Sequence, residues 1–371
     1  MPQPVSHADP RPGRVTRVVS ALTEHHLDAL LVTGAANIRY LTGFSGSSAL
    51  LLVTPRELLF LTDFRYDTQV KEEVGDLARV RIENVSLWTG LWEELSSQPK
   101  TAVIGFESSN VMHRDFSRFL HEAEGGRWQW RPQSGIVETL REAKDPGEVA
   151  RIEQAADVAT HALHATIPQI RPGLTELQVA GILEKALRDH GSEAYPFETI
   201  VASGPRSALP HARASQRTVE RGDFVLLDFG AQVDGYCSDI TRTFVIGRAD
   251  AQQREIYQIV REANELAIAG IRPGMTGADA DALARDYIAG RGYGDDFGHS
   301  LGHGLGLEVH EAPRVSRTSS TTLPVHTVVT VEPGIYRAGW GGVRIEDDVY
   351  VLPDGVRVLT DFTHDLLELP A

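Results

Sequence analysis

The first part of the chain alternates short apolar runs with segments whose apolar residues recur at helical spacing. Runs of roughly four to eight apolar residues between turn signals indicate strands, and recurrence at i, i+3 and i+4 indicates amphipathic helices. The strands predicted in this way are Ala29–Val32, Ala49–Thr54, Leu58–Thr62 and Ala102–Phe106, and the helices lie near Arg14–His25, Tyr66–Val74 and His113–Ala123. This alternation predicts an α/β domain over residues 15–137.

The segments on either side of this domain differ from it in composition. Residues 1–14 are rich in proline and polar residues without periodicity, which is typical of a disordered segment. The charged segment Glu138–Val149 contains Pro146-Gly147 and precedes a long helical pattern. We therefore place the domain boundary there, and the second domain is predicted to span residues 138–371.

The second domain contains an internal repeat. The segment Ile170–Thr175 (IRPGLT) recurs 101 positions later as Ile271–Thr276 (IRPGMT). Each copy follows a long helical pattern and precedes a second one, which ends near Gly191 in the first copy and Gly292 in the second. Glycine-punctuated β-rich sequence comes next. This order predicts two related α/β halves that face each other across a groove.

A predicted β-hairpin in the first half carries two carboxylates. Two strand-like runs over residues 224–244 flank Asp234-Gly235, which is a strong hairpin-turn signal. With this turn, Asp228 pairs with Thr241 and Asp239 lies one diagonal away; a turn one residue earlier would place Asp228 directly opposite Asp239. In either register the period of two puts both carboxylates on one face. Because like charges repel, the arrangement predicts a cation between them.

The second half supplies another pair of carboxylates at a comparable place. Glu332 ends a predicted strand, and Glu346 lies in the next one across a glycine-rich turn. Three histidines, His299, His303 and His310, lie between Phe297 and Glu311 among glycines that allow close approach of the backbone. Two carboxylates from each half would converge on the groove.

Four carboxylates and one imidazole carry four negative charges, which two divalent cations neutralise. An oxygen-rich ligand set suits Mn²⁺, Fe²⁺ or Co²⁺ better than a thiolate site would. We therefore predict two divalent ions, with Mn²⁺ first and Co²⁺, Zn²⁺ or Fe²⁺ as alternatives. Such a pair of ions supplies a nucleophile and polarises a carbonyl group.

Composition limits the partners and the compartment. The formal net charge of −15 argues against nucleic-acid or anionic-membrane partners, because both bind clusters of Lys and Arg. Cys237 is the single cysteine, so no intramolecular disulfide can form. We find no apolar signal segment and no apolar run near the roughly 20 residues of a membrane helix. A soluble, cytoplasmic protein without a membrane partner is expected.

The segments that carry these residues resemble the four motifs of the pita-bread metallopeptidases, and within that group they are similar to Xaa-Pro aminopeptidases and prolidases. The four segments are Asp228–Thr243, Gly298–Glu311, Glu332–Tyr336 and Gly342–Asp348. The likeness covers roughly residues 140–369, and Asn37–Phe44 (NIRYLTGF) resembles the creatinase-type N-terminal domain of the same family. It implies an α/β (α+β) fold, with a creatinase-like domain followed by a pita-bread catalytic domain that has an internal pseudo-twofold repeat.

The resemblance also implies a role for each matching residue. The implied metal ligands are Asp228, Asp239, His303, Glu332 and Glu346. The implied substrate-binding residues are His211, His299, His310, Tyr336 and Arg344. Of these residues, His211, His310, Glu332 and Arg344 are implied to act in catalysis, with Glu332 also moving a proton.

The implied reaction is metal-dependent hydrolysis of the bond between an N-terminal residue and a following proline. The loops between the motifs are short, which should leave the groove open beyond the proline. We therefore predict a Xaa-Pro aminopeptidase, with a Xaa-Pro dipeptidase (prolidase) as the alternative. A non-catalytic peptide-binding module with this fold is a more distant alternative. The resemblance further implies a homodimer. The other implied partner is the substrate, a peptide with proline at its second position.

Overall fold

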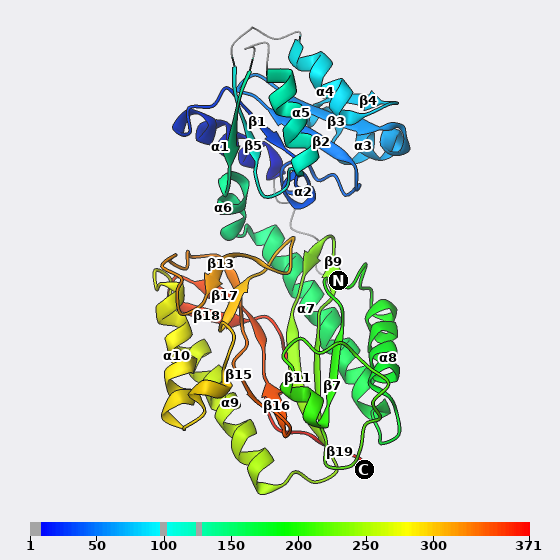
Figure 1. The fold of residues 1–371 in the computed structure, drawn as a ribbon, viewed down its shortest axis with the longest axis vertical. Coiled ribbons are helices and arrows are strands. Elements are labelled where there is room, and N and C mark those ends of the chain that lie inside the picture. Colours follow the sequence, from blue (N-terminus) through cyan, green and yellow to red (C-terminus); the bar gives the residue numbers. More distant parts are fainter. Residues whose placement is uncertain (1–8, 97–101, 124–127) are drawn as a thin grey trace. The chain divides into compact units, whose positions relative to one another are not determined.

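The computed structural model describes residues 9–96, 102–123 and 128–371 (Figure 1). The chain divides into two compact units, Met1–Arg141 and Glu142–Ala371. Within the described ranges, no helix combines the length and the apolarity that a membrane span requires.

The first unit is built on one mixed six-stranded sheet with the strand order β4-β3-β2-β1-β5-β6 (Figure 1). The strands are β1 (Ala29–Val32), β2 (Ala49–Val53), β3 (Leu58–Asp63), β4 (Arg79–Glu83), β5 (Ala102–Glu107) and β6 (Trp128–Gln133). The helices are α1 (Arg11–Glu24), α2 (Ala35–Thr42), α3 (Asp67–Glu73), α4 (Leu87–Ser96), α5 (His113–Ala123) and α6 (Ile136–Glu142). Short 3₁₀ turns cover Phe64–Tyr66 and Gly75–Leu77.

The predicted strands of this unit form its central part. The sheet buries alternate side chains, such as Leu31, Leu52 and Leu61, against Leu91 of α4 and Phe119 of α5. The sequence pattern does not predict β4 and β6, the two edge strands. Their sequences, RVRIE and WQWRPQ, mix charged and apolar residues because an edge strand is only partly buried.

Helix α1 begins earlier than expected. The predicted disordered segment 1–14 includes residues 1–8, which lie outside the described residues, but α1 starts at Arg11 within that segment. Pro12 falls in the first helical turn, where a missing N–H breaks no helical hydrogen bond. Arg14 is buried and donates from Nη1 to the carbonyl oxygen of Tyr40 at 2.8 Å. This tertiary contact, which composition cannot reveal, orders the helix.

The second unit consists of two halves with the same order of elements. The first half contains α7 (Pro146–Thr166), α8 (Glu176–Asp189) and a four-stranded sheet of β19 (Glu368–Leu369), β11 (Ile240–Ile246), β8 (Phe224–Phe229) and β7 (Ile200–Ser203). The small hairpin β9 (Gln232–Val233) and β10 (Tyr236–Cys237) extends from β8 and β11. Short 3₁₀ turns cover Ile167–Gln169 and Gly204–Ala208.

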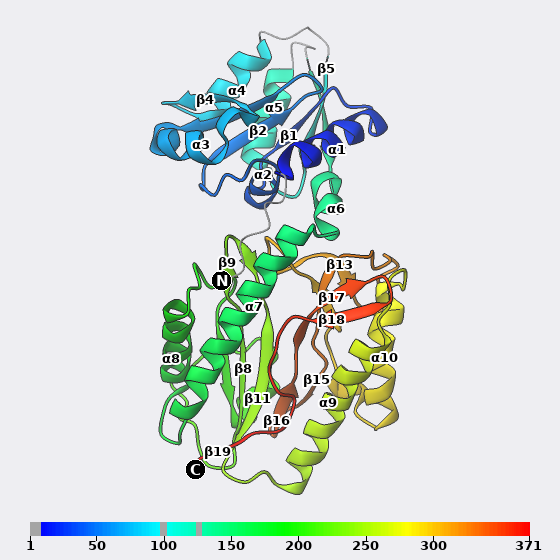
Figure 2. The same cartoon turned by 180° about the vertical axis from the view of Figure 1, so that it is seen from behind.

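The second half contains α9 (Ala251–Gly270), α10 (Gly277–Gly290) and a five-stranded sheet. Its strands, in spatial order, are β13 (Glu311–Val315), β12 (Gly302–Gly304), β14 (Val328–Val331), β17 (Asp347–Leu352) and β18 (Gly355–Val358). The hairpin of β15 (Gly334–Arg337) and β16 (Gly341–Arg344) forms a separate pair, and a 3₁₀ turn covers Gly294–Asp296. Figure 2 shows α7 and α8 beside the first sheet, and α9 and α10 beside the second.

The repeat seen in the sequence has the same local structure in both copies. Thr175 caps α8 and Thr276 caps α10, each by accepting a hydrogen bond from the backbone N–H three residues later. Gly173 and Gly274 both adopt left-handed backbone angles, with φ of 89° and 82°. The shared stop signal therefore turns the chain in the same way before each second helix.

The end of β16 and the residues after it make hydrogen bonds with β11 of the first half. The Thr243 hydroxyl donates to the carbonyl oxygen of Arg344 at 3.0 Å, and the N–H of Glu346 donates to the carbonyl oxygen of Thr241 at 3.1 Å. Residues 344–346, at the end of the β15–β16 hairpin, thus lie along β11. This contact brings side chains of the second half close to the β8–β11 hairpin, which carries Asp228 and Asp239.

A pair of glycine substitutions tests the packing around that hairpin. A Cβ atom on Gly230, at the end of β8, would lie 2.0 Å from the carbonyl oxygen of Ser238, whereas one on Gly181 of α8 would meet no atom within 4 Å. We expect Gly230→Ala to lower the free energy of unfolding by about 1–3 kcal/mol. Gly181→Ala should raise it by about 0.5–1 kcal/mol. Urea unfolding measures both, and equal stability of the two variants would contradict this description of the packing.

Candidate metal centre and substrate-binding residues

Of the two registers that the sequence allows, the β8–β11 hairpin has the one set by an Asp234-Gly235 turn. Asp234 and Gly235 form the turn, with φ of 47° and 77°, and Asp228 pairs with Thr241. Asp239 precedes β11 by one residue. Both carboxylates are buried, as expected for side chains that face the interior of the groove rather than solvent.

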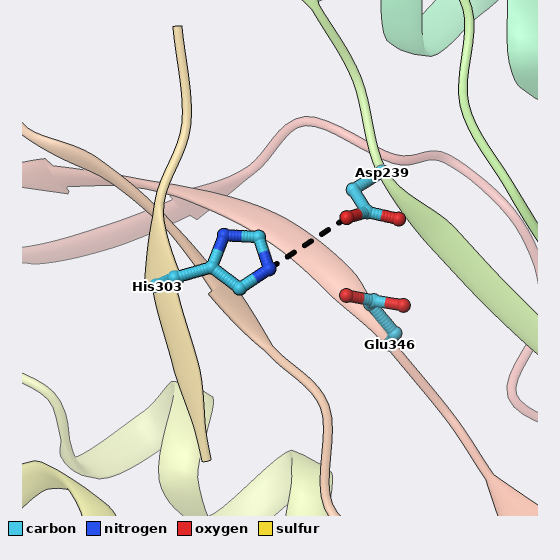
Figure 3. Close-up of side chains that lie close together, drawn as sticks. All are labelled: Asp239, His303 and Glu346. Carbon is cyan, nitrogen blue, oxygen red and sulfur yellow. Dashed lines mark ion pairs between the residues drawn. The ribbon is translucent and has the colours of Figure 1, made fainter. Parts of the chain in front are cut away.

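Three of the predicted ligands form a compact cluster. Asp239, His303 and Glu346 each offer one ligand atom, and these atoms lie within 4.8 Å of one another (Figure 3). The His303 Nε2 atom lies 3.7 Å from Asp239 Oδ2 and 3.5 Å from Glu332 Oε1. The structure therefore brings Glu332 to the same histidine nitrogen, at the edge of the three-residue cluster.

Asp228 takes part in a different interaction. Its Oδ2 atom accepts a short hydrogen bond from Arg344 Nη2, and the two side chains form a buried ion pair. Arg344 also donates from Nη1 to the Tyr336 hydroxyl at 2.7 Å and from Nε to the Thr241 hydroxyl at 3.0 Å. Arg344 and Tyr336, both predicted to bind substrate, thus lie directly beside a predicted metal ligand.

The predicted substrate-binding histidines surround the carboxylates. His299 Nε2 lies 2.8 Å from the Tyr336 hydroxyl. The ring of His310 lies 4.3 Å from that of His303, centroid to centroid, and its side chain is exposed. His211 is also exposed, on the segment between β7 and β8. His211 and His310 both contribute to the electrostatic environment of the Asp228 carboxyl group.

Burial and mutual repulsion dominate the electrostatics of the carboxylates. Burial, together with the charges of Glu346 and Asp228, raises the pKa of Asp239 well above its usual range. Burial and Glu346 do the same to the pKa of Glu332. Burial and Asp228 raise the pKa of Glu346 to about 8. Without a cation, burial and mutual repulsion thus disfavour the charged forms of all three groups.

The histidine shifts complement those of the carboxylates. Burial and the neighbouring His310 lower the pKa of His303 to about 4, so its imidazole is neutral and has a lone pair for a metal. The Oδ1 atom of Asp239 is buried and has no hydrogen-bond partner among the described residues. An unpaired buried acceptor beside a neutral imidazole and other carboxylates fits a divalent cation, which would satisfy all of them at once.

Side chains outside the predicted set hold the ligands in place. The Thr241 hydroxyl donates to Glu346 Oε2 at 2.6 Å, and Asp348 Oδ2 accepts from the N–H of Asp239 at 3.0 Å. Arg242, fully buried, donates from Nη1 to the carbonyl oxygen of Glu346 at 2.6 Å. Sequence reasoning missed these residues, although each lies within or beside a motif segment; a buried position next to a ligand is the signal that could have found them.

Arg314 is a further residue near the cluster that the sequence pattern does not indicate. It pairs directly with His303 across β12 and β13, and residues that are directly opposite in an antiparallel pair point to the same face. Its side chain is exposed. Burial is the largest cause that lowers the pKa of His310; Asp228 opposes this shift, and the charges of His211 and Arg314 add to it. Arg314 therefore lies on the metal-cluster side of the sheet. Its pairing with His303 depends on a strand register that sequence spacing does not give.

The fold and the acidic, histidine-lined cluster define a two-domain metallopeptidase. Residues 150–353 match the model of metallopeptidase family M24, and residues 14–143 match the creatinase/prolidase N-terminal domain. The chain belongs to metallopeptidase family M24. The predicted fold class and the prediction of a metallo-exopeptidase are both confirmed.

Relatives and solved structures match over nearly the whole chain. The Xaa-Pro dipeptidase of Pyrococcus furiosus is 37% identical, over 95% of this chain and 99% of the relative. The structure of a Xaa-Pro dipeptidase from Bacillus anthracis is 40% identical with a TM-score of 0.92, over 97% of this chain and 100% of the other. The X-Pro aminopeptidase structure from Thermotoga maritima is 38% identical with a TM-score of 0.87, over 96% and 99%.

The raised carboxylate pKa values predict how the stability of the metal-free protein depends on pH. The folded-state pKa of Glu346, about 8, lies above its ordinary value of 4.5. Its contribution to stability is therefore complete below about pH 4.5 and is lost as the pH rises through about 8. We expect the metal-free protein to lose on the order of a few kcal/mol between about pH 5 and pH 8.

Urea unfolding in the presence of a chelator measures this dependence. Glu346→Gln should lose less stability over the same pH range, because the amide has no charge to bury. Adding Mn²⁺ at pH 8 should restore stability to the unsubstituted protein more than to Glu346→Gln. A stability profile that is flat in chelator and unaffected by metal would contradict the electrostatic description.

Proposed function

We propose that the chain is a Xaa-Pro dipeptidase that hydrolyses the bond between the first residue and a C-terminal proline. The observation that carries this proposal is the close cluster of Asp239, His303, Glu332 and Glu346, where burial and mutual repulsion disfavour the charged carboxylates unless cations are bound. The named dipeptidases among the relatives support the reaction.

Two divalent ions complete the proposed centre. The residues that would hold these ions are Asp228, Asp239, His303, Glu332 and Glu346. The ligand set carries four negative charges, and its oxygen-rich composition favours Mn²⁺. When bound, such ions activate water and polarise the carbonyl group of the substrate.

The remaining side chains bind substrate and move protons. We propose that the neutral imidazole of His310 donates to the oxygen that becomes negative in the transition state. Glu332, whose pKa is raised by burial and by Glu346, is suited to receive a proton and pass it to the leaving nitrogen. His211, His299, Tyr336 and Arg344 hold the peptide; the hydrogen bonds of Tyr336 to His299 and Arg344 support this grouping.

Substrate length is where the proposal departs from the sequence prediction. The short loops favour an aminopeptidase, but the relatives support the dipeptidase alternative at least as well. A dipeptidase needs a cation for the carboxylate of the proline. Arg314 is exposed, and its register with His303 directs it to the face of the metal cluster. We assign this carboxylate-binding role to Arg314, because a guanidinium group can form two hydrogen bonds to a carboxylate.

Peptides of different length test this assignment. We expect the Mn²⁺-loaded enzyme to hydrolyse Xaa-Pro with a kcat/KM at least about tenfold higher than Xaa-Pro-Yaa with the same first residue. Arg314→Ala should raise KM for the dipeptide by about 10- to 100-fold, since a charge-assisted bidentate contact is lost. The difference in kcat/KM between Xaa-Pro and Xaa-Pro-Yaa should therefore become smaller. Arg248→Ala, at an exposed arginine beyond the end of β11, is the control. Equal turnover of both peptides would favour the aminopeptidase instead.

The metal assignment has its own test. Asp239→Asn should lose most of its activity and at least about one bound ion per chain, because an amide is a weaker ligand than a carboxylate. Its circular dichroism spectrum should match that of the unsubstituted protein. Asp234→Asn, at the exposed tip of the same hairpin, should retain both metal and activity. Full metal content in Asp239→Asn, measured by elemental analysis, would refute the assignment.

We further propose that the protein is a cytoplasmic homodimer. The homodimer is what the resemblance to the family implies, and the single cysteine is compatible with a reducing compartment. Light scattering at micromolar concentration tests the assembly, and a mass equal to that of one chain would exclude it.

A further inference from the structure

We propose that Glu176 and Asp281 are positioning residues that anchor the two loops carrying the substrate-binding histidines His211 and His299. Each acid holds the histidine loop of its own half and does so without belonging to the metal cluster. The inference rests on the proposed function, because it assigns these carboxylates to the affinity for Xaa-Pro substrates.

Glu176 joins the two ends of the loop that carries His211. It is the first residue of α8, and its side chain is fully buried. Its Oε1 atom accepts from the N–H and the hydroxyl of Ser203 at 2.8 and 2.9 Å. Its Oε2 atom accepts from the N–H and the hydroxyl of Ser215 at 3.0 and 2.6 Å. One carboxylate thus ties together both ends of the segment Ser203–Ser215, and His211 lies between them.

Arg206 completes this anchor from inside the loop. Its Nε atom lies 3.0 Å from Glu176 Oε2, which compensates the buried charge, and its Nη2 atom donates to the carbonyl oxygen of Arg213 at 2.6 Å. The carbonyl oxygen of Pro210, next to His211, accepts from Arg344 Nη1 at 3.4 Å. Glu176 therefore holds both ends of the loop, and Pro210 in its middle contacts Arg344 beside the metal cluster.

Asp281 does the same for the loop that carries His299. It lies on α10, is 1% exposed, and accepts from the N–H of Leu301 at 2.9 Å. Its ion-pair partner Arg285 donates to the carbonyl oxygens of Phe297 and His299 at 2.8 and 2.7 Å. The guanidinium carbon of Arg285 also lies 4.1 Å from the centre of the Phe297 ring. An acid and an arginine therefore hold the backbone on both sides of the His299 side chain.

The two anchors use the same element of the internal repeat. Each acid lies on the helix that follows the Pro-Gly stop and pairs with an arginine that binds loop carbonyls. They are not at equivalent positions, because the residue 101 positions after Glu176 is Gly277, and Asp281 lies one helical turn further along α10. A Cβ on Gly277 would lie 2.1 Å from the carbonyl oxygen of Arg314, which leaves no room for a side chain there.

The physical consequence concerns binding more than chemistry. Ordering a loop when substrate binds costs conformational entropy, and a loop that is already fixed avoids that cost. The anchors hold backbone atoms of the histidine loops but contact none of the metal-cluster side chains in the described structure. Loosening them should therefore weaken substrate binding while the metal centre is retained.

Isosteric substitutions test the proposal in the Mn²⁺-loaded, full-length protein. In Glu176→Gln and Asp281→Asn an NH₂ group replaces one carboxylate oxygen. Because this group faces hydrogen-bond donors and cannot accept from them, each loop loses part of the hydrogen bonding that holds it. We expect KM for Xaa-Pro to rise about tenfold, while kcat changes by less than about twofold and the metal content is unchanged. Glu184→Gln on α8 and Asp286→Asn on α10 serve as matched controls and should retain the original KM.

Arginine substitutions provide a second route if an acid variant fails to fold. Arg206→Lys and Arg285→Lys keep the positive charge but lose the donors to the loop carbonyls, and they should raise KM in the same way. An unchanged KM in all four variants would overturn the proposal. A fall in kcat that follows loss of metal would overturn it as well, because the acids would then support the centre.

Hydrogen exchange separates this inference from the proposed function. Backbone amides of residues 203–215 and 297–301 should exchange faster in the acid variants than in the unsubstituted protein, whatever the substrate is. If the unsubstituted protein hydrolyses no Xaa-Pro peptide, the proposed function fails, and faster exchange confined to these loops would still support the anchoring. Unchanged exchange in both loops would refute the anchoring even in an active enzyme.

Discussion

Repulsion between buried carboxylates is the constraint on which the rest of the catalytic unit depends. Asp228, Asp239, Glu332 and Glu346 are brought into one interior by two separate halves of the chain, and burial alone already disfavours their charged forms. Their proximity adds to this penalty. A metal ion bound between them would offset this penalty, and the neutral state of His303 follows from the same burial. The fold thus holds together groups whose charged forms a bound metal would stabilise.

Such a site needs a rigid frame, because its side chains would otherwise move apart. The frame is the contact between β11 and the segment that contains Glu346. Arg242 bridges this contact by donating to the carbonyl oxygen of Glu346 and by pairing with Asp347, and both side chains are fully buried. Asp347 also accepts from Thr360 and His364. A buried charge with this many partners fixes the relative position of the two halves where the ligands meet.

Local signals in the sequence predicted much of this arrangement, and contacts between distant segments explain the rest. The Asp234-Gly235 turn was enough to place Asp228 and Asp239 on one face, because a hairpin register is set by its turn. The repeated IRPG segment predicted the two halves. The ion pair between Asp228 and Arg344 and the position of Arg314 opposite His303 depend on the pairing of strands that are far apart in sequence. No spacing rule gives that pairing.

The predicted metal ligands lie on or beside strands, whereas two predicted substrate-binding histidines lie on loops. All five predicted metal ligands, Asp228, Asp239, His303, Glu332 and Glu346, lie on or directly beside strands that the sheets hold in register. The exposed His211 and the half-buried His299 lie on loops, which sheet pairing does not restrain. A side chain on such a loop keeps a defined position only if contacts outside the sheets hold the loop. A buried acid paired with an arginine holds each loop, so the predicted metal ligands and the predicted substrate-binding histidines are held by separate sets of contacts.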